Sequence, residues 1–154
     1  MANDASVTIK ATVLPDEIAK TISGTLTVSP TDANDKWYYK LTSVSAASSN
    51  LIAGYFTDYD AVDDDTAPTA IATTDTVRFL LVKNTDAAND IYINLDGGTI
   101  TNADGDAIKV SAGNSMAIEV PNTTVGNINC IGYDPVGAAA ATATAVVAAL
   151  IDDV

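Results

Sequence analysis

The chain has no histidine among its 154 residues. Histidine is the commonest general acid and base in enzymes, the usual partner of a nucleophilic serine or cysteine, and the commonest neutral metal ligand. Its absence excludes hydrolase triads and most zinc and iron sites. Paired carboxylates can still catalyse, as in glycoside hydrolases, but the acidic residues here cluster in turns, where Asp is favoured for backbone reasons. We predict a protein that is not an enzyme, with no catalytic, cofactor-binding or metal-binding residue.

Basic residues are also scarce. Seven lysines and arginines oppose twenty acidic residues, which gives a net charge of −13, and Arg78 is the only arginine. A protein that binds nucleic acid needs a basic stripe to neutralise phosphates. The charge therefore predicts no nucleic-acid partner and no anionic membrane partner. An acidic, solvated surface is the expected consequence.

Cysteine, targeting signals and long apolar runs are nearly missing. Cys130 is the single cysteine, so no intramolecular disulfide can form, and its context "NINCIGY" favours a buried strand position. The start "MANDASVTIK" lacks the basic residues and apolar core of a signal peptide. The longest apolar-leaning tract, residues 138–151, is shorter than the about 20 apolar residues that span a bilayer. We expect synthesis and folding in the cytoplasm.

Strand patterns are what the sequence has in abundance. "SVTIKATVL" alternates strictly, with Val7, Ile9 and Val13 on one face and polar residues on the other, and "TISGTLTVSP" repeats the pattern until Pro30. Such alternation predicts half-buried strands. "KWYYKLTSV" and "NLIAGYF" are the third and fourth predicted strands.

The second half opens with residues 77–82, which are apolar on both faces apart from Arg78 and predict a central, covered strand. "DAAND" is predicted to turn the chain and "IYINL" to return it as the second strand of a hairpin. Residues 96–98, Asp-Gly-Gly, predict a tight turn because glycine accepts positive φ. The Ala/Thr-rich residues 138–151 are open to helix or strand, and the alternation of Thr, Ala and Val favours a last strand.

These patterns together predict the fold class. Nine or ten short strands separated by turn signals, with no convincing amphipathic helix, are typical of an all-β protein. We predict a single antiparallel β-sandwich, jelly-roll or Ig-like, over residues 1–154. Residues 57–75 are predicted to form a long acidic surface loop, and the two termini are able to extend onto a neighbouring chain.

Two acidic segments raise the question of calcium, which prefers hard oxygen ligands on loops. The loop at 57–75 offers Asp58, Asp60, Asp63 and Asp64, and the turn "NADGD" offers Asp104 and Asp106. The longer segment lacks the glycine and the terminal glutamate of a helix-loop-helix calcium loop, and the turn is shorter still. Whether these loops bind a cation stays open.

The aromatic stretch "KWYYK" is the best candidate for a contact surface, because exposed Trp and Tyr are typical anchors of interfaces. Strand alternation puts Trp37 and Tyr39 on one face and Tyr38 on the other. One of these faces belongs to the core. The candidate contact residues are Trp37, Tyr38 and Tyr59.

Residues 76–151 resemble small β-sandwich virion proteins of tailed bacteriophages. The resemblance is carried by an apolar strand ending in Val-Lys-Asn-Thr at 82–85, a strand closing on Asp-Gly-Gly at 96–98, and an Ala-Gly-Asn-Ser step at 112–115. The first 75 residues add only a compatible strand pattern. These are turn and strand signatures, and other sandwiches can share them.

The resemblance implies a structural role. We expect a capsid decoration, or cement, protein that is made in the host cytoplasm and binds the outside of a phage capsid shell to stabilise it. Its expected partners are the major capsid protein and further copies of itself, with a trimer as the expected assembly. The alternatives are a phage neck or tail component, or a carbohydrate- or receptor-binding β-sandwich module.

Overall fold

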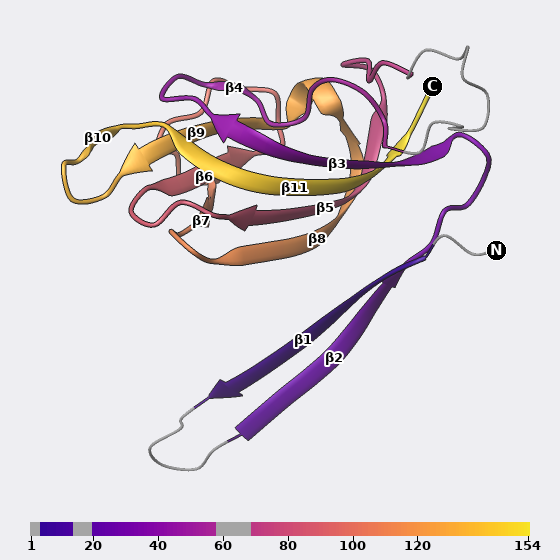
Figure 1. The fold of residues 1–154 in the computed structure, drawn as a ribbon, viewed down its shortest axis with the longest axis horizontal. Coiled ribbons are helices and arrows are strands. Elements are labelled where there is room, and N and C mark those ends of the chain that lie inside the picture. Colours follow the sequence, from indigo (N-terminus) through magenta and orange to yellow (C-terminus); the bar gives the residue numbers. More distant parts are fainter. Residues whose placement is uncertain (1–3, 14–19, 58–68) are drawn as a thin grey trace. The chain divides into compact units, whose positions relative to one another are not determined.

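The computed structural model describes residues 4–13, 20–57 and 69–154 and contains eleven strands and one short 3-10 helix in this part of the chain (Figure 1). The prediction of an all-β antiparallel fold is confirmed, with one strand more than the upper predicted number. Within the described ranges, no helix has the length and apolar character needed to cross a membrane.

The chain divides into two compact units, Met1–Ala33 and Asn34–Val154. We call them the hairpin unit and the sandwich unit. The sequence predicted one sandwich over residues 1–154, whereas the strands of the two packed sheets all lie within the second unit.

The hairpin unit contains β1 (Ala5–Val13) and β2 (Lys20–Val28), which pair antiparallel over their full length. Val7 lies opposite Leu26, and Ile9 lies opposite Gly24. The two strands were predicted correctly. Their predicted half-burial is wrong for the single chain, because Ile9 is 52% exposed and Ile22 is 64% exposed.

The first sheet of the sandwich unit has four strands in the order β3-β11-β5-β8 (Figure 1). Their bounds are β3 (Asp35–Val44), β11 (Ala143–Asp152), β5 (Thr76–Asn84) and β8 (Ser115–Thr124). The Ala/Thr-rich tail is therefore a strand, as its alternation predicted, and it occupies the centre of the sheet beside β5.

The second sheet has five strands in the order β10-β9-β6-β7, with β4 paired to β9. Their bounds are β10 (Ala139–Ala140), β9 (Asn129–Asp134), β6 (Asp90–Asn94), β7 (Ile108–Val110) and β4 (Ser49–Asn50). The 3-10 helix η1 (Val125–Asn127) connects β8 of the first sheet to β9 of the second.

The hydrophobic core lies between these two sheets. Every second residue of β11 from Ala143 to Ile151 belongs to it, as the pleat requires. β11 supplies small residues, among them Ala145 and Val147, while β3 supplies Tyr38 and β6 supplies Ile91 and Ile93. Cys130 is also a core residue on β9, 1% exposed, as its sequence context predicted.

The predicted hairpin of residues 77–94 is wrong, because β5 and β6 lie in different sheets. The connecting residues 85–89 form a corner instead of a hairpin turn. Asn84 is fully buried at the end of β5, where this corner begins. Its side-chain amide donates to the carbonyl oxygens of Asn89 (2.9 Å) and Val110 (3.0 Å), which ties the first sheet to β7 of the second.

The predicted strand "NLIAGYF" is mostly irregular. Only Ser49–Asn50 pairs as a strand, and Gly54 has a φ of 117°, which interrupts an extended run. Leu51, Ile52 and Phe56 are nevertheless buried. The apolar pattern correctly indicated core residues, but the chain delivers them through a loop.

Two glycines show how closely the sandwich unit is packed. Gly97 has a φ of 81°, which confirms the predicted turn at 96–98, and its amide donates to the carbonyl oxygen of Asn127 (3.0 Å). Gly132 on β9 faces backbone directly, and a methyl group there would lie 2.1 Å from the carbonyl oxygen of Ala141. Neither position has room for another residue.

Candidate protein-contact surface

The four-stranded sheet turns an apolar face away from the core. Its residues lie in register across the strands: Tyr39 is opposite Ala148, Ala148 is opposite Leu81, and in the next row Leu41 is opposite Val146. Tyr39 is 63% exposed and Leu41 is 66% exposed. We call these five residues the outer sheet face.

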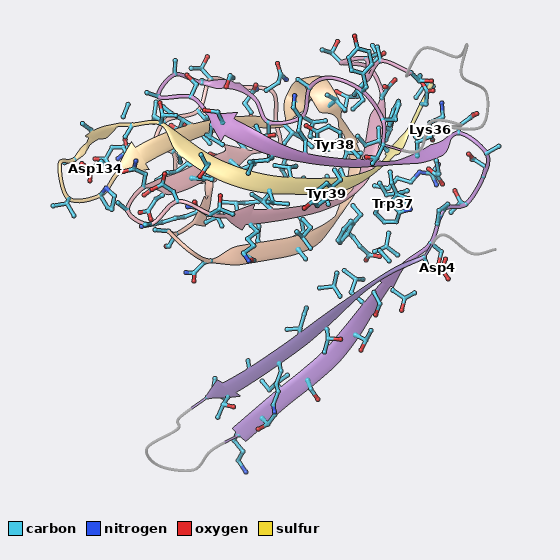
Figure 2. All side chains as sticks on the ribbon, viewed as in Figure 1. Asp4, Lys36, Trp37, Tyr38, Tyr39 and Asp134 are labelled. Atoms are coloured by element: carbon cyan, nitrogen blue, oxygen red, sulfur yellow. The ribbon has the colours of Figure 1, made fainter. Side chains whose placement is uncertain are left out.

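Two of the predicted contact residues, Trp37 and Tyr38, are labelled in Figure 2 and differ in their exposure. Tyr38 is 1% exposed, belongs to the core, and donates its hydroxyl to the carbonyl oxygen of Ala53 (3.3 Å), so it is not a surface residue. Trp37 is partly exposed beside the outer sheet face, with its ring edge-on to Phe79 at a centroid distance of 6.4 Å. Tyr59 lies outside the described residues.

The hairpin unit carries a second apolar face. Cross-strand pairing places Val7, Ile9, Ala11, Ile22 and Leu26 on one side of the two-stranded sheet. We call these five residues the hairpin face. The opposite side carries only Ser, Thr and Lys10 within the strands. The hairpin is therefore amphipathic, and Ile9 and Ile22 on its apolar face are more than 50% exposed.

The five-stranded sheet presents a third surface, built on tyrosines. Tyr92 on β6 and Tyr133 on β9 stack edge-on with their ring centroids 5.9 Å apart. Lys109 on β7 lies 5.8 Å from the centroid of the Tyr92 ring and 2.7 Å from a carboxylate oxygen of Asp90. The hydrogen bond to Asp90 raises the pKa of Lys109. We call Tyr92, Tyr133 and Lys109 the tyrosine cluster.

Most acidic residues in the described part of the sandwich unit take part in hydrogen bonds or ion pairs within the chain. Asp104 accepts hydrogen bonds from the Thr101 amide (2.5 Å) and hydroxyl (3.0 Å), as expected for a turn aspartate. Arg78 lies 3.1 Å from Asp35 and 2.7 Å from Asp152 at the end of the first sheet. These cations and amides already engage the carboxylates. The proposed calcium residues of the 57–75 loop, Asp58, Asp60, Asp63 and Asp64, lie outside the described residues.

Neither the Cys130 thiol nor a hollow beside β3 has the chemistry of a reactive site. Burial raises the pKa of the Cys130 thiol to about 11, so it is protonated and unreactive at neutral pH. A hollow of about 230 Å³ lies beside β3, with Lys40 as the one charged residue in its lining. The Lys40 ammonium donates to the carbonyl oxygen of Ala53 (3.1 Å), and the lining offers no acid to pair with it.

No protein-family description, no curated protein and no solved structure matches the chain.

Of the two candidate contact residues on β3, Trp37 is partly exposed and Tyr38 is buried, and the exposed Tyr39 was not among the candidates. The alternation correctly separated Trp37 and Tyr39 from Tyr38. It did not show which side is buried, because that depends on the second sheet. The hairpin face was visible as Val7, Ile9 and Leu26, and was interpreted as core because apolar strand faces are usually covered within the chain.

Proposed function

We propose that this chain is a non-enzymatic structural protein that assembles into a larger particle. The observation that carries the proposal is the pair of exposed apolar faces, on which Ile22, Tyr39 and Leu41 are all more than 60% exposed. A folded chain that works alone rarely exposes extended apolar patches, and such patches commonly mark protein contacts. The absence of histidine agrees with this role without establishing it.

More specifically, we propose that the particle is a phage capsid and that the chain decorates the outside of the shell. The sequence resemblance over residues 76–151 supports this form, as does the net charge of −13. An acidic protein is repelled by packaged nucleic acid and therefore suits an outer surface.

The tyrosine cluster is the surface that we propose for contact with the shell. Tyr92 and Tyr133 hold each other in one geometry, and the ion pair to Asp90 fixes Lys109 beside them. Rigid tyrosines lose little conformational entropy on binding, and they are enriched among the residues that dominate interface energies. The cluster belongs to the five-stranded sheet and leaves the outer sheet face of the other sheet available.

Decoration would stabilise a shell through binding free energy alone. A copy that binds only the intact lattice stabilises it by RT ln(1 + [L]/Kd), about 2.7 kcal/mol when the free protein is at a hundredfold excess over Kd. Many equivalent copies multiply this small contribution. No chemical step is required of the chain.

The first experiment counts copies in purified particles of the phage that encodes the chain, by quantitative mass spectrometry against the major shell protein. Hundreds of copies per particle are expected for a decoration protein. A few copies would favour a neck or tail component. Absence from the particle would overturn the proposal in its capsid form.

The second experiment tests the contact surface. Purified chain is sedimented with undecorated shells, and a Tyr92→Ala, Tyr133→Ala double variant is compared with wild type. We expect at least a tenfold loss of affinity, because both aromatic anchors are removed. Tyr55→Ala is the matched control, since Tyr55 is also a tyrosine of the sandwich unit, is 60% exposed and does not belong to the tyrosine cluster. Equal binding by the double variant and wild type would exclude the tyrosine cluster as the contact.

A further inference from the structure

We infer that the hairpin face of one copy packs on the outer sheet face of a second copy, so that the chain self-associates by exchanging hairpins. The inference rests on the structural role proposed above but not on the capsid. An isolated two-stranded hairpin is only marginally stable in water. Among the described residues β1 and β2 pair only with each other, so a layer that covers their apolar face would stabilise them.

Gly24 is the first specific sign of a partner. It lies in the middle of β2, opposite Ile9, on the hairpin face. A glycine inside a strand costs roughly 0.5–1 kcal/mol relative to alanine, and it often marks a point where another group approaches closely. Gly24 has no positive φ, and a methyl group placed there would meet no atom of the described chain within 4 Å. The hairpin itself therefore gives no packing reason for a glycine at this position.

The outer sheet face has the matching shape. In the row Tyr39, Ala148 and Leu81, the small residue stands between two large ones, so the row is low in its middle. On the hairpin face, the large side chains of Ile9 and Ile22 protrude beside the gap at Gly24. An aromatic ring such as Tyr39 is the kind of side chain that covers a strand glycine. Large side chains of each face thus meet small residues of the other.

The area is also sufficient when the exchange is reciprocal. Each hairpin strand has nine residues, so the hairpin face is about 30 Å long and roughly 10 Å wide. Two reciprocal contacts, each covering on the order of 300 Å² on both sides, bury on the order of 1,200 Å² in total, the lower bound of stable interfaces. We therefore expect a closed assembly whose population depends on protein concentration.

The test is sedimentation equilibrium of the purified full-length chain, with no shell protein present, across a wide concentration range. Wild type is expected to be oligomeric at high concentration. Ile9→Lys and Leu41→Lys are each expected to raise the dissociation constant at least tenfold, because each buries a charge in one half of the contact. Thr8→Lys places the same charge on the polar side of β1 and is the matched control, expected to behave as wild type.

Gly24→Ala separates association from hairpin folding. Alanine favours the strand over glycine, so the hairpin itself should not be weakened. The added methyl group occupies the gap that the second copy is inferred to fill, so the dissociation constant should rise. If no group of a second copy filled this gap and the hairpin only needed to be stable, alanine would instead lower the dissociation constant.

Mixing the variants distinguishes the partner face. An Ile9→Lys chain has an intact outer sheet face, and a Leu41→Lys chain has an intact hairpin face, so an equimolar mixture should regain one of the two contacts and associate more tightly than either variant alone. A wild-type chain that stays monomeric at every concentration would overturn the inference. So would a Leu41→Lys chain that associates as tightly as wild type, since the hairpin would then bind elsewhere. Loss of shell binding with intact self-association would instead count only against the capsid proposal.

Discussion

The hairpin unit and the sandwich unit each contain a glycine in the interior of a strand, and the two glycines have opposite surroundings. At Gly132 an added methyl group would lie 2.1 Å from the carbonyl oxygen of Ala141 and 3.0 Å from the amide nitrogen of Ala143. At Gly24 it would meet no atom of the described chain within 4 Å. The sandwich unit explains its glycine from within the chain, whereas the hairpin unit does not.

The same contrast appears in the apolar residues. In the sandwich unit both sheets contribute to one core, with Val82, Ile93 and Val147 fully buried. In the hairpin unit the apolar residues at the centre of the strands remain largely exposed, Ile9 and Ile22 among them. Apolar strand residues are thus buried between two sheets in the sandwich unit and largely exposed in the hairpin unit. The self-association inferred above would cover the exposed face of the hairpin.

The largest effect that tests this contrast is expected from Gly132→Ala. The new methyl group collides with backbone, which cannot rotate away as a side chain can, so we expect a loss of about 3 kcal/mol or more of unfolding free energy. Urea unfolding followed by circular dichroism measures it. The same replacement at Gly24 should leave the unfolding of the sandwich unit within about 1 kcal/mol of wild type. Equal effects at the two glycines would remove the contrast.

An intermediate effect is expected from Asn84→Ala. The side chain is fully buried, and its removal leaves the carbonyl oxygens of Asn89 and Val110 without this donor. We expect a loss of about 1–3 kcal/mol of unfolding free energy. Thr25→Ala on the exposed polar side of the hairpin is the comparison in the other unit, with an expected change below about 1 kcal/mol. If Asn84→Ala were silent, the corner would not depend on this amide.

The smallest effect concerns pH. Hydrogen bonds from the Asn89 amide and then the Ala88 amide lower the pKa of Asp86 below its ordinary 3.8. A lowered pKa in the folded state contributes stability above about pH 4, and this contribution is lost as the pH falls through the folded-state pKa. Because Asp86 is exposed to solvent, we expect less than about 1 kcal/mol between pH 7 and pH 3.

Asp86→Asn keeps an acceptor oxygen and removes the titration, so the variant should lose less stability than wild type over the same acid range. Unfolding free energies at the two pH values measure the difference between the chains. The hairpin strands contain no acidic residue and should add nothing to this difference. A variant with the same acid sensitivity as wild type would show that the Asp86 charge is not coupled to folding.

Much of the local structure could be predicted from the sequence. Alternation identified β1, β2 and β11, aromatic residues identified β3, and Gly97 of the 96–98 turn has the positive φ that the turn requires. The pairing of β5 with β6 could not be predicted in the same way. Residues 85–89 have the sequence of a hairpin turn. At the corner that they form instead, the Asn84 side-chain amide donates to the carbonyl oxygen of Val110 on β7, more than twenty residues away.

The exposure of the aromatic residues on β3 could be predicted only in part. Alternation placed Trp37 and Tyr39 together and Tyr38 apart, but burial of Tyr38 depends on the second sheet and on Ala53, its hydrogen-bond partner. The hairpin face was seen in full and misinterpreted as core. Its exposure follows from tertiary contacts that the hairpin strands do not make, and a pattern along one strand carries no information about them.

The sequence by itself determined the all-β class, the positions of most strands, the acidic charge and the lack of histidine chemistry, because these depend on residue type and on neighbours within a few positions. Only the tertiary structure decided which strands share a sheet, which aromatic ring is buried and which apolar faces remain open. Sheet partners are chosen by contacts between residues far apart in the chain, and the side of a strand that becomes core is fixed only when a second layer covers it.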